Sequence, residues 1–183
     1  MRKIVLTLSL LSATLAGFGQ TFMTRTGKIS FNATTPGSPE KIEGINNEVA
    51  TIIDAKTGNI VFQLPVKSFK FEKELMQEHF NENYMESDKF PRSEFKGNIT
   101  NMNEVYFTKD GTYKANVTGK LTMHGVTKDV TVPGTITIAG SSLKASARFT
   151  IKLQDYGINV PGMVADKVAK DAIIKLESDL EKK

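Results

Sequence analysis

Residues 143–153 read LKASARFTIKL, a stretch in which apolar and polar side chains alternate without interruption. Alternation at a period of two is typical of a β-strand, because successive side chains of a strand point to opposite faces of the sheet. One face of this strand is therefore predicted to be buried and the other to face water. The six apolar positions are Leu143, Ala145, Ala147, Phe149, Ile151 and Leu153.

The same alternation recurs along the chain, at residues 29–33, 60–64, 117–123 and 172–180. Stretches rich in glycine, proline and small polar residues separate these runs and predict turns. Among them, Asp110-Gly111 lies between two alternating runs and predicts a tight hairpin. Counting the runs gives about eight closely spaced strands, which predicts an all-β sandwich or an up-and-down barrel.

One segment breaks the period of two. Between Lys73 and Met85, the apolar and aromatic side chains recur every three or four residues, which is the spacing of an amphipathic helix. A helix this short is not stable alone in water. We therefore expect it to pack on the barrel or across its mouth.

The N-terminus has the layout of a secretory signal peptide. Arg2 and Lys3 precede an uncharged, mostly apolar run, and small residues then lead to a cleavage point before Gln20. A membrane anchor would need about 20 apolar residues, and this run is shorter. We expect residues 1–19 to be removed and residues 20–183 to form a single soluble domain, either periplasmic or secreted from a bacterium.

Composition excludes several classes of function. The chain has no cysteine, which excludes disulfides, thiolate metal sites and cysteine nucleophiles. Loss of Arg2 and Lys3 lowers the formal charge from +4 to +2, and no block of like charges follows, so no nucleic-acid partner is expected. Phosphate-binding glycine loops and a G-x-S-x-G nucleophile motif are also missing. We predict that the protein is not an enzyme and has no catalytic residue and no metal site.

The two histidines, His79 and His124, are the remaining candidates for special chemistry. An imidazole can bind haem or a metal, or contact the polar head of a ligand. It can also simply fix a turn or a helix through hydrogen bonds. We favour this second interpretation for both residues, because their spacing matches no local metal-binding motif.

Phenylalanine and methionine are concentrated in the predicted strands and beside the helix. Flat rings and flexible thioethers line pockets for chain-like ligands well, although they also serve as ordinary core residues. An eight-stranded barrel has an interior that side chains just fill or that holds one small ligand. The small, inward-facing residues Gly119, Ala145 and Ala147 would leave room for such a ligand.

Three motifs resemble the YceI-like family. Residues 79–95 read HFNENYMESDKFPRSEF, residues 119–130 read GKLTMHGVTKDV, and residues 153–158 read LQDYGI. They are similar to the family's His-led helix with its Lys-aromatic-Pro turn, its strand pair and its Asp-aromatic-Gly element. The resemblance covers residues 24–180, although residues 24–32 lack the Asp and His residues of the family's first strand.

This resemblance implies a lipocalin-like, eight-stranded antiparallel β-barrel with a short helix near one end. It also implies an elongated apolar cavity for isoprenoid or other long-chain lipids, so the expected partner is a long-chain amphiphilic small molecule. No cofactor other than a bound lipid or isoprenoid is expected, and transient membrane contact and a homodimer are left open. His124 or Tyr156 is a candidate to meet the polar head of the ligand, because a buried head group needs a hydrogen-bond partner.

We therefore predict an exported protein that sequesters or carries a long-chain apolar or isoprenoid lipid. Two alternatives remain open: a periplasmic stress or interaction protein whose barrel is filled by side chains, and a haem-binding electron carrier that uses both histidines. The predicted ligand-binding residues are Phe31, Phe62, His79, Phe80, Tyr84, Phe90, Phe95, Leu121, Met123, His124, Phe149, Ile151 and Tyr156.

Overall fold

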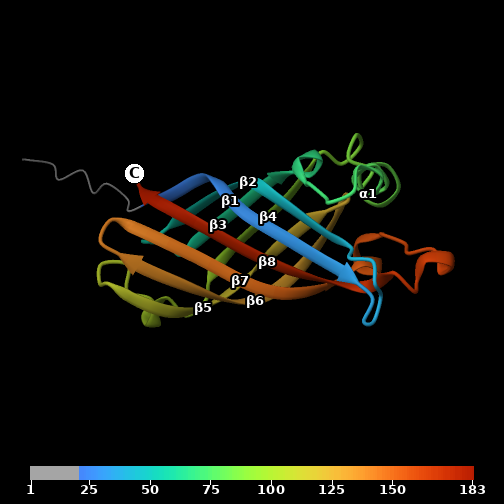
Figure 1. Cartoon of the computed structure of the whole chain (residues 1–183). Coiled ribbons are helices and arrows are strands. Elements are labelled where there is room, and N and C mark those ends of the chain that lie inside the picture. The colour runs from blue at the N-terminus through green and yellow to red at the C-terminus, as the bar shows by residue number, and fades with distance from the viewer. Residues whose placement is uncertain (1–20) are drawn as a thin grey trace, which may run out of the picture.

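Eight antiparallel strands close into one barrel (Figure 1), in a computed structural model that describes residues 21–183. The predicted signal peptide, residues 1–19, lies outside the described residues. Each strand pairs with the next in the sequence, and β8 pairs with β1. This confirms the predicted all-β, lipocalin-like barrel. The strands are β1 (Thr21–Thr34), β2 (Glu43–Asp54), β3 (Asn59–Pro65), β4 (Arg92–Ile99), β5 (Gly111–Met123), β6 (Val126–Ala139), β7 (Ser142–Lys152) and β8 (Val168–Lys182).

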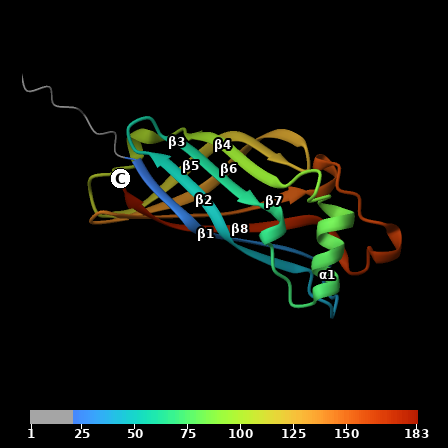
Figure 2. The same ribbon diagram turned by 90° about the horizontal axis from the view of Figure 1, so that it is seen from above.

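The predicted helix is present and lies across one end of the barrel (Figure 2). It consists of α1 (Glu74–His79) and a π-helical turn (Phe80–Tyr84), and it is part of the connection between β3 and β4. Among the described residues, no helix is both long enough and apolar enough to cross a membrane. Short 3₁₀ turns occupy Val66–Ser68, Met102–Glu104, Leu153–Tyr156 and Gly162–Val164.

The hairpin predicted at Asp110-Gly111 is wrong. β5 begins at Gly111, and the connection from β4 is a longer loop that contains a 3₁₀ turn. The Asp110 carboxylate instead accepts a hydrogen bond from the backbone N–H of Gly140, which joins two loops at the same end of the barrel. A tight hairpin turn does occur at His124-Gly125, where both residues have positive φ and the flanking residues of β5 and β6 pair directly.

Apolar packing closes the end of the barrel opposite α1. Buried side chains there come from the start of β1, the end of β2, the loop after β4 and the β7–β8 pair. The largest of them are Phe22, Ile53, Phe107, Leu143 and Leu180. Because this plug fills one end, any interior space must lie between it and α1.

The ladder between β6 and β7 is incomplete. These strands pair only from Ala139 and Ser142, beside their turn, to Gly134 and Ala147. The first half of β6 pairs with β5 but not with the second half of β7, which pairs with β8. Pro133, next to the end of the ladder, has no N–H to donate. The barrel wall therefore separates between β6 and β7 on the side toward α1.

Candidate functional site

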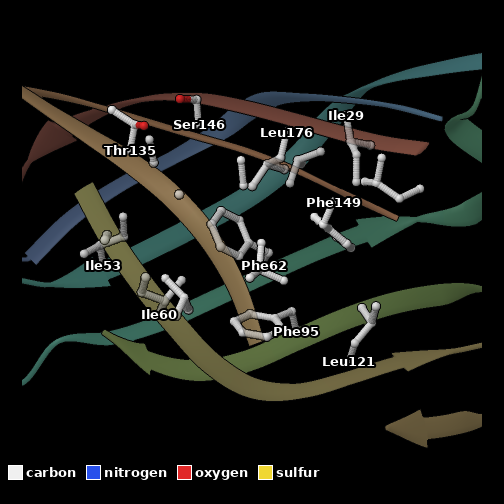
Figure 3. Close-up of a pocket in the computed structure, with 18 of the residues that line it drawn as sticks. Ile29, Ile53, Ile60, Phe62, Phe95, Leu121, Thr135, Ser146, Phe149 and Leu176 are labelled. Atoms are coloured by element: carbon white, nitrogen blue, oxygen red, sulfur yellow. The ribbon is translucent and has the colours of Figure 1, made fainter. Parts of the chain in front are cut away.

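An apolar cavity of about 130 Å³ lies inside the middle of the barrel (Figure 3). We call it the inner cavity. Its walls are contributed by every strand, because a closed sheet turns one face of each strand inward. Side chains that line it include Ile29, Ile53, Ile60, Phe62, Phe95, Leu121, Ala145, Ala147, Phe149 and Leu176.

The alternation of β7 explains how the inner cavity is formed. Ala145, Ala147 and Phe149 face it in succession, and the two alanines leave the space that larger side chains would fill. Gly119 does not have the predicted role. A Cβ at Gly119 would lie 2.7 Å from a ring carbon of Phe95, so the space beside this glycine is already occupied by that ring.

A second and larger cavity, of about 520 Å³, lies between the barrel end and α1. We call it the outer cavity. Phe31 and Ile151 line it from the strands, and Phe80 and Tyr84 line it from the π-helical turn. In this turn the backbone N–H of Met85 donates to the carbonyl oxygen of Phe80, an i to i+5 bond. Phe80 and Tyr84 are four residues apart, a spacing that places both side chains on the same face of a helical turn.

Four phenylalanine rings lie between the two cavities. Phe80 stacks on Phe31 at a centroid distance of 5.2 Å and contacts Phe69 and Phe71 at 5.2 and 5.0 Å. The same rings pack on residues that line the inner cavity, and Ile174 lines both cavities. The inner and outer cavities are therefore neighbours inside one barrel, separated by aromatic side chains.

The charged groups at the outer cavity neutralise one another in part. The Glu40 carboxylate lies 2.8 Å from the Lys73 ammonium and 3.2 Å from the Lys167 ammonium. Hydrogen bonds from these two lysines lower the pKa of Glu40, and the Glu40 partner raises the pKa of Lys73. His79 also lines this cavity, and its Nδ1 lies 3.0 Å from the Asn83 amide nitrogen.

The structure brings nine of the thirteen predicted ligand-binding residues to the cavities. Phe62, Phe95, Leu121 and Phe149 line the inner cavity. The outer cavity is lined by Phe31, His79, Phe80, Tyr84 and Ile151. The other four residues, which line neither cavity, are Phe90, Met123, His124 and Tyr156.

His124 joins three segments of the chain instead of facing a cavity. Its Nε2 lies 2.8 Å from a carboxylate oxygen of Glu86, and its Nδ1 lies 2.9 Å from the backbone oxygen of Tyr156. Glu86 and His124 both have positive φ, so the hydrogen bond links two strained backbone positions. The ring of Phe90 packs edge-on against the imidazole at 4.9 Å. These contacts fit the interpretation of His124 as a residue that fixes a turn.

Neither Tyr156 nor His124 lines one of the two cavities. Tyr156 is buried, and burial together with the nearby Asp155 raises the pKa of its phenol. Both ring nitrogens of His124 already have partners, so an iron ligand would have to replace one of them. Within residues 21–183, no three His, Cys, Asp or Glu side chains cluster in a way that could hold a metal ion.

Some cavity residues were absent from the predicted set. Phe69 and Phe71 follow β3 at a spacing of two, and this alternation is a signal that could have identified them. Met163 and Val164 line the outer cavity from the 3₁₀ turn Gly162–Val164, which is too short to show a periodicity, so no local pattern indicated them. The cluster of Glu40, Lys73 and Lys167 comes from three loops far apart in the sequence.

These features define an antiparallel barrel of the lipocalin type with an apolar, partly empty interior. A family model described as "YceI-like domain" matches residues 20–179, and the chain belongs to this family. The resemblance of its motifs is thereby confirmed. No curated protein sequence matches the chain.

Solved structures of similar fold come from several bacteria. A polyisoprenoid binding domain from Saccharophagus degradans, implicated in plant cell wall breakdown, aligns with a TM-score of 0.76 at 10% identity over 90% of this chain and 99% of its own. BcnA from Burkholderia cenocepacia aligns with a TM-score of 0.67 at 21% identity, covering 84% of this chain and 95% of its own. The Campylobacter jejuni YceI protein aligns with a TM-score of 0.50 at 17% identity, covering 72% and 80%. At these identities the likeness shows the fold alone.

Proposed function

We propose that the protein binds one long-chain apolar or isoprenoid lipid inside the barrel and carries or sequesters it without chemical change. The observation that carries this proposal is the pair of neighbouring apolar cavities in line between the packed end and α1. The similar Saccharophagus degradans structure is described as a polyisoprenoid binding domain, which supports the same ligand class here.

The cavity volumes suit a chain-like ligand. An apolar cavity of about 150 Å³ is large enough to hold benzene. The inner cavity, about 130 Å³, therefore has room for one five-carbon isoprene unit. The outer cavity, about 520 Å³, falls within the range of about 300–1,000 Å³ usual for small-molecule sites and can take the rest of the chain.

Burial of the chain supplies the binding energy in this proposal. Each CH₂ removed from water contributes about 0.8 kcal/mol, so a ten-carbon stretch contributes roughly 8 kcal/mol before the costs of ordering. The wall of the inner cavity offers almost only carbon atoms, which suits a hydrocarbon. Export of the protein through residues 1–19 is part of the proposal.

Two observations weigh against the alternatives. A filled barrel is disfavoured by the two cavities inside it. A haem carrier that uses both histidines is disfavoured because His124 already bonds to Glu86 and to the Tyr156 carbonyl. Titration with haem tests that alternative directly, since iron coordination would shift the Soret band.

Native mass spectrometry of the mature protein, followed by solvent extraction, tests the proposed function. We expect a stoichiometric excess of mass that extracts as one long-chain or isoprenoid lipid. A polypeptide that is purified without ligand, and that takes up nothing from a mixed lipid extract, would refute the proposal. The filled-barrel interaction protein would then be the better interpretation.

A further inference from the structure

The break between β6 and β7 lies in the wall that separates the inner cavity from the outside. A surface groove of about 570 Å³ runs over this break. Six residues line both the groove and the inner cavity, and four of them, Gly134, Thr135, Ser146 and Ala147, are the last pairs of the β6–β7 ladder. Figure 3 shows Thr135 and Ser146 together at one edge of the cavity. We call this place the side opening.

The wall is thin at the side opening for a local reason. Gly134 has no side chain, and a Cβ there would lie 3.1 Å from the backbone oxygen of Ser146. Across from it, Ala147 offers only a methyl group. At this pair, only backbone atoms and one methyl group therefore separate the groove from the inner cavity.

Three basic side chains surround the outer face of the side opening. Arg148 and Lys175 are directly opposite each other on β7 and β8, and Lys114 lies on β5. All three are exposed. Like charges directly opposite in a sheet are unfavourable unless an anion lies between them.

None of these three cations is paired with a carboxylate in the part of the chain that the structure describes. Among the described residues that line the groove, Glu177 is the one acid, and it is paired instead with Lys144 at 4.0 Å. An arginine beside a lysine suits a phosphate group, because the guanidinium can donate two parallel hydrogen bonds while the ammonium adds charge.

We propose that the side opening binds the anionic head group of the lipid, a phosphate or diphosphate ester, while the chain passes through the wall into the inner cavity. Arg148 and Lys175 hold the head group, and Lys114 adds positive charge from across the groove. This inference rests on the proposed function and names its ligand class as an anionic long-chain or isoprenoid ester.

The competing location for a head group is the mouth beside α1. There, the carboxylate of Glu40 already bonds to Lys73 and Lys167, so these two cations are partly neutralised. Within residues 21–183, no carboxylate pairs with the cations at the side opening. The side opening also shares its wall with the apolar inner cavity, so a head group outside and a chain inside would lie on the two sides of one thin segment.

Binding of farnesol and of farnesyl phosphate, which share one chain, tests the head-group site. The variant is Arg148→Ala/Lys175→Ala, and the control is Lys56→Ala/Lys109→Ala, which removes the same charge from exposed residues in other loops. We expect the wild type to bind farnesyl phosphate about tenfold or more tightly than farnesol, as charge-assisted hydrogen bonds predict. The variant should lose this preference and keep its affinity for farnesol, and the control should behave as the wild type.

Each contrary outcome has one meaning. Equal losses in the variant and the control would refute the head-group site, because net charge alone would then explain the preference. Inorganic phosphate that binds the wild type as tightly as farnesyl phosphate would make this a free-anion site and refute its role for a lipid. A wild type that binds farnesol without preferring the phosphate refutes the head-group site alone. A wild type that binds neither compound refutes the proposed function itself.

Discussion

Substitution of Ala145 by leucine would fill part of the inner cavity with the protein's own side chain. Ala145 is buried on β7 and lines this cavity. A cavity of 130 Å³ lowers the free energy of unfolding by roughly 3 kcal/mol, at about 24 cal/mol per Å³. This is the largest gain in stability that filling the cavity can give. The three added carbons contribute roughly 2.4 kcal/mol at about 0.8 kcal/mol each. Ordering the leucine costs about 0.5–1 kcal/mol, so a net stabilisation of about 1.5 kcal/mol is expected.

Stability and ligand affinity should therefore change in opposite directions. Urea unfolding should show a higher midpoint with an unchanged m-value, and Tm should rise by about 3–6 °C. Affinity for farnesol should fall on the order of 10- to 50-fold, because the leucine occupies the space of one isoprene unit. Ala139→Leu, at an exposed position at the end of β6, is the matched control and should change neither property.

Two results would refute this reasoning. If Ala145→Leu lowers the free energy of unfolding by more than about 1 kcal/mol, the added side chain is overpacked and the inner cavity is not free space. If the variant is more stable but binds farnesol as tightly as the wild type, the ligand chain does not occupy the inner cavity.

Three further predictions concern the wall, the mouth and its rim. The buried hydroxyls of Thr51 and Ser178 lie 2.9 Å apart and form a hydrogen bond. Ser178→Ala leaves the Thr51 hydroxyl without this partner and should lower the free energy of unfolding, measured in urea, by about 1–2 kcal/mol. An unchanged urea midpoint would contradict this. The lowered pKa of Glu40 means that its stabilising contribution is present at neutral pH and is lost as pH falls through that pKa. Glu40→Gln should therefore lower Tm at about pH 7, and this difference should shrink as pH falls below the ordinary glutamate pKa of about 4.3; a difference that stays the same at acid pH would exclude this linkage. Leu75 and Met163 line the outer cavity and are 61% and 92% exposed, so they form an apolar rim that can contact a membrane. The Leu75→Ser/Met163→Ser variant should therefore take up lipid from vesicles more slowly, with unchanged Tm. An unchanged rate of uptake would mean that this rim does not contact the membrane.

The alternation of apolar and polar residues predicted the inward face of the strands well. In β7, every second residue from Leu143 to Ile151 is apolar, and Ala145, Ala147, Phe149 and Ile151 all line a cavity. The reason is physical: in a strand, the side-chain period is set by the backbone itself, so one buried face fixes which residues point inward. The short helix was equally predictable, because its spacing of three and four residues contrasts with the strands around it.

Residues in turns were predicted less well. Asp110-Gly111 has the composition of a hairpin turn, but Asp110 bonds to a different loop. His124 or Tyr156 was a candidate to meet a ligand head group, while a turn-fixing role was the favoured interpretation of His124. The structure joins the His124 imidazole to the backbone oxygen of Tyr156 and to Glu86. A loop side chain has no period that reports its direction, so its partner depends on contacts between segments far apart in the sequence.

The sequence by itself determined the class of fold, the inward faces of the strands and the apolar character of the interior. These properties depend on local backbone geometry and on burial, and the residue pattern of a single strand already shows which of its faces is buried. Only the tertiary structure decided where the space lies and what surrounds it. The ring of Phe95 fills the gap beside Gly119, the β6–β7 ladder stops at Gly134, and Arg148 stands opposite Lys175. Each of these depends on the register between neighbouring strands, which is fixed when the barrel closes.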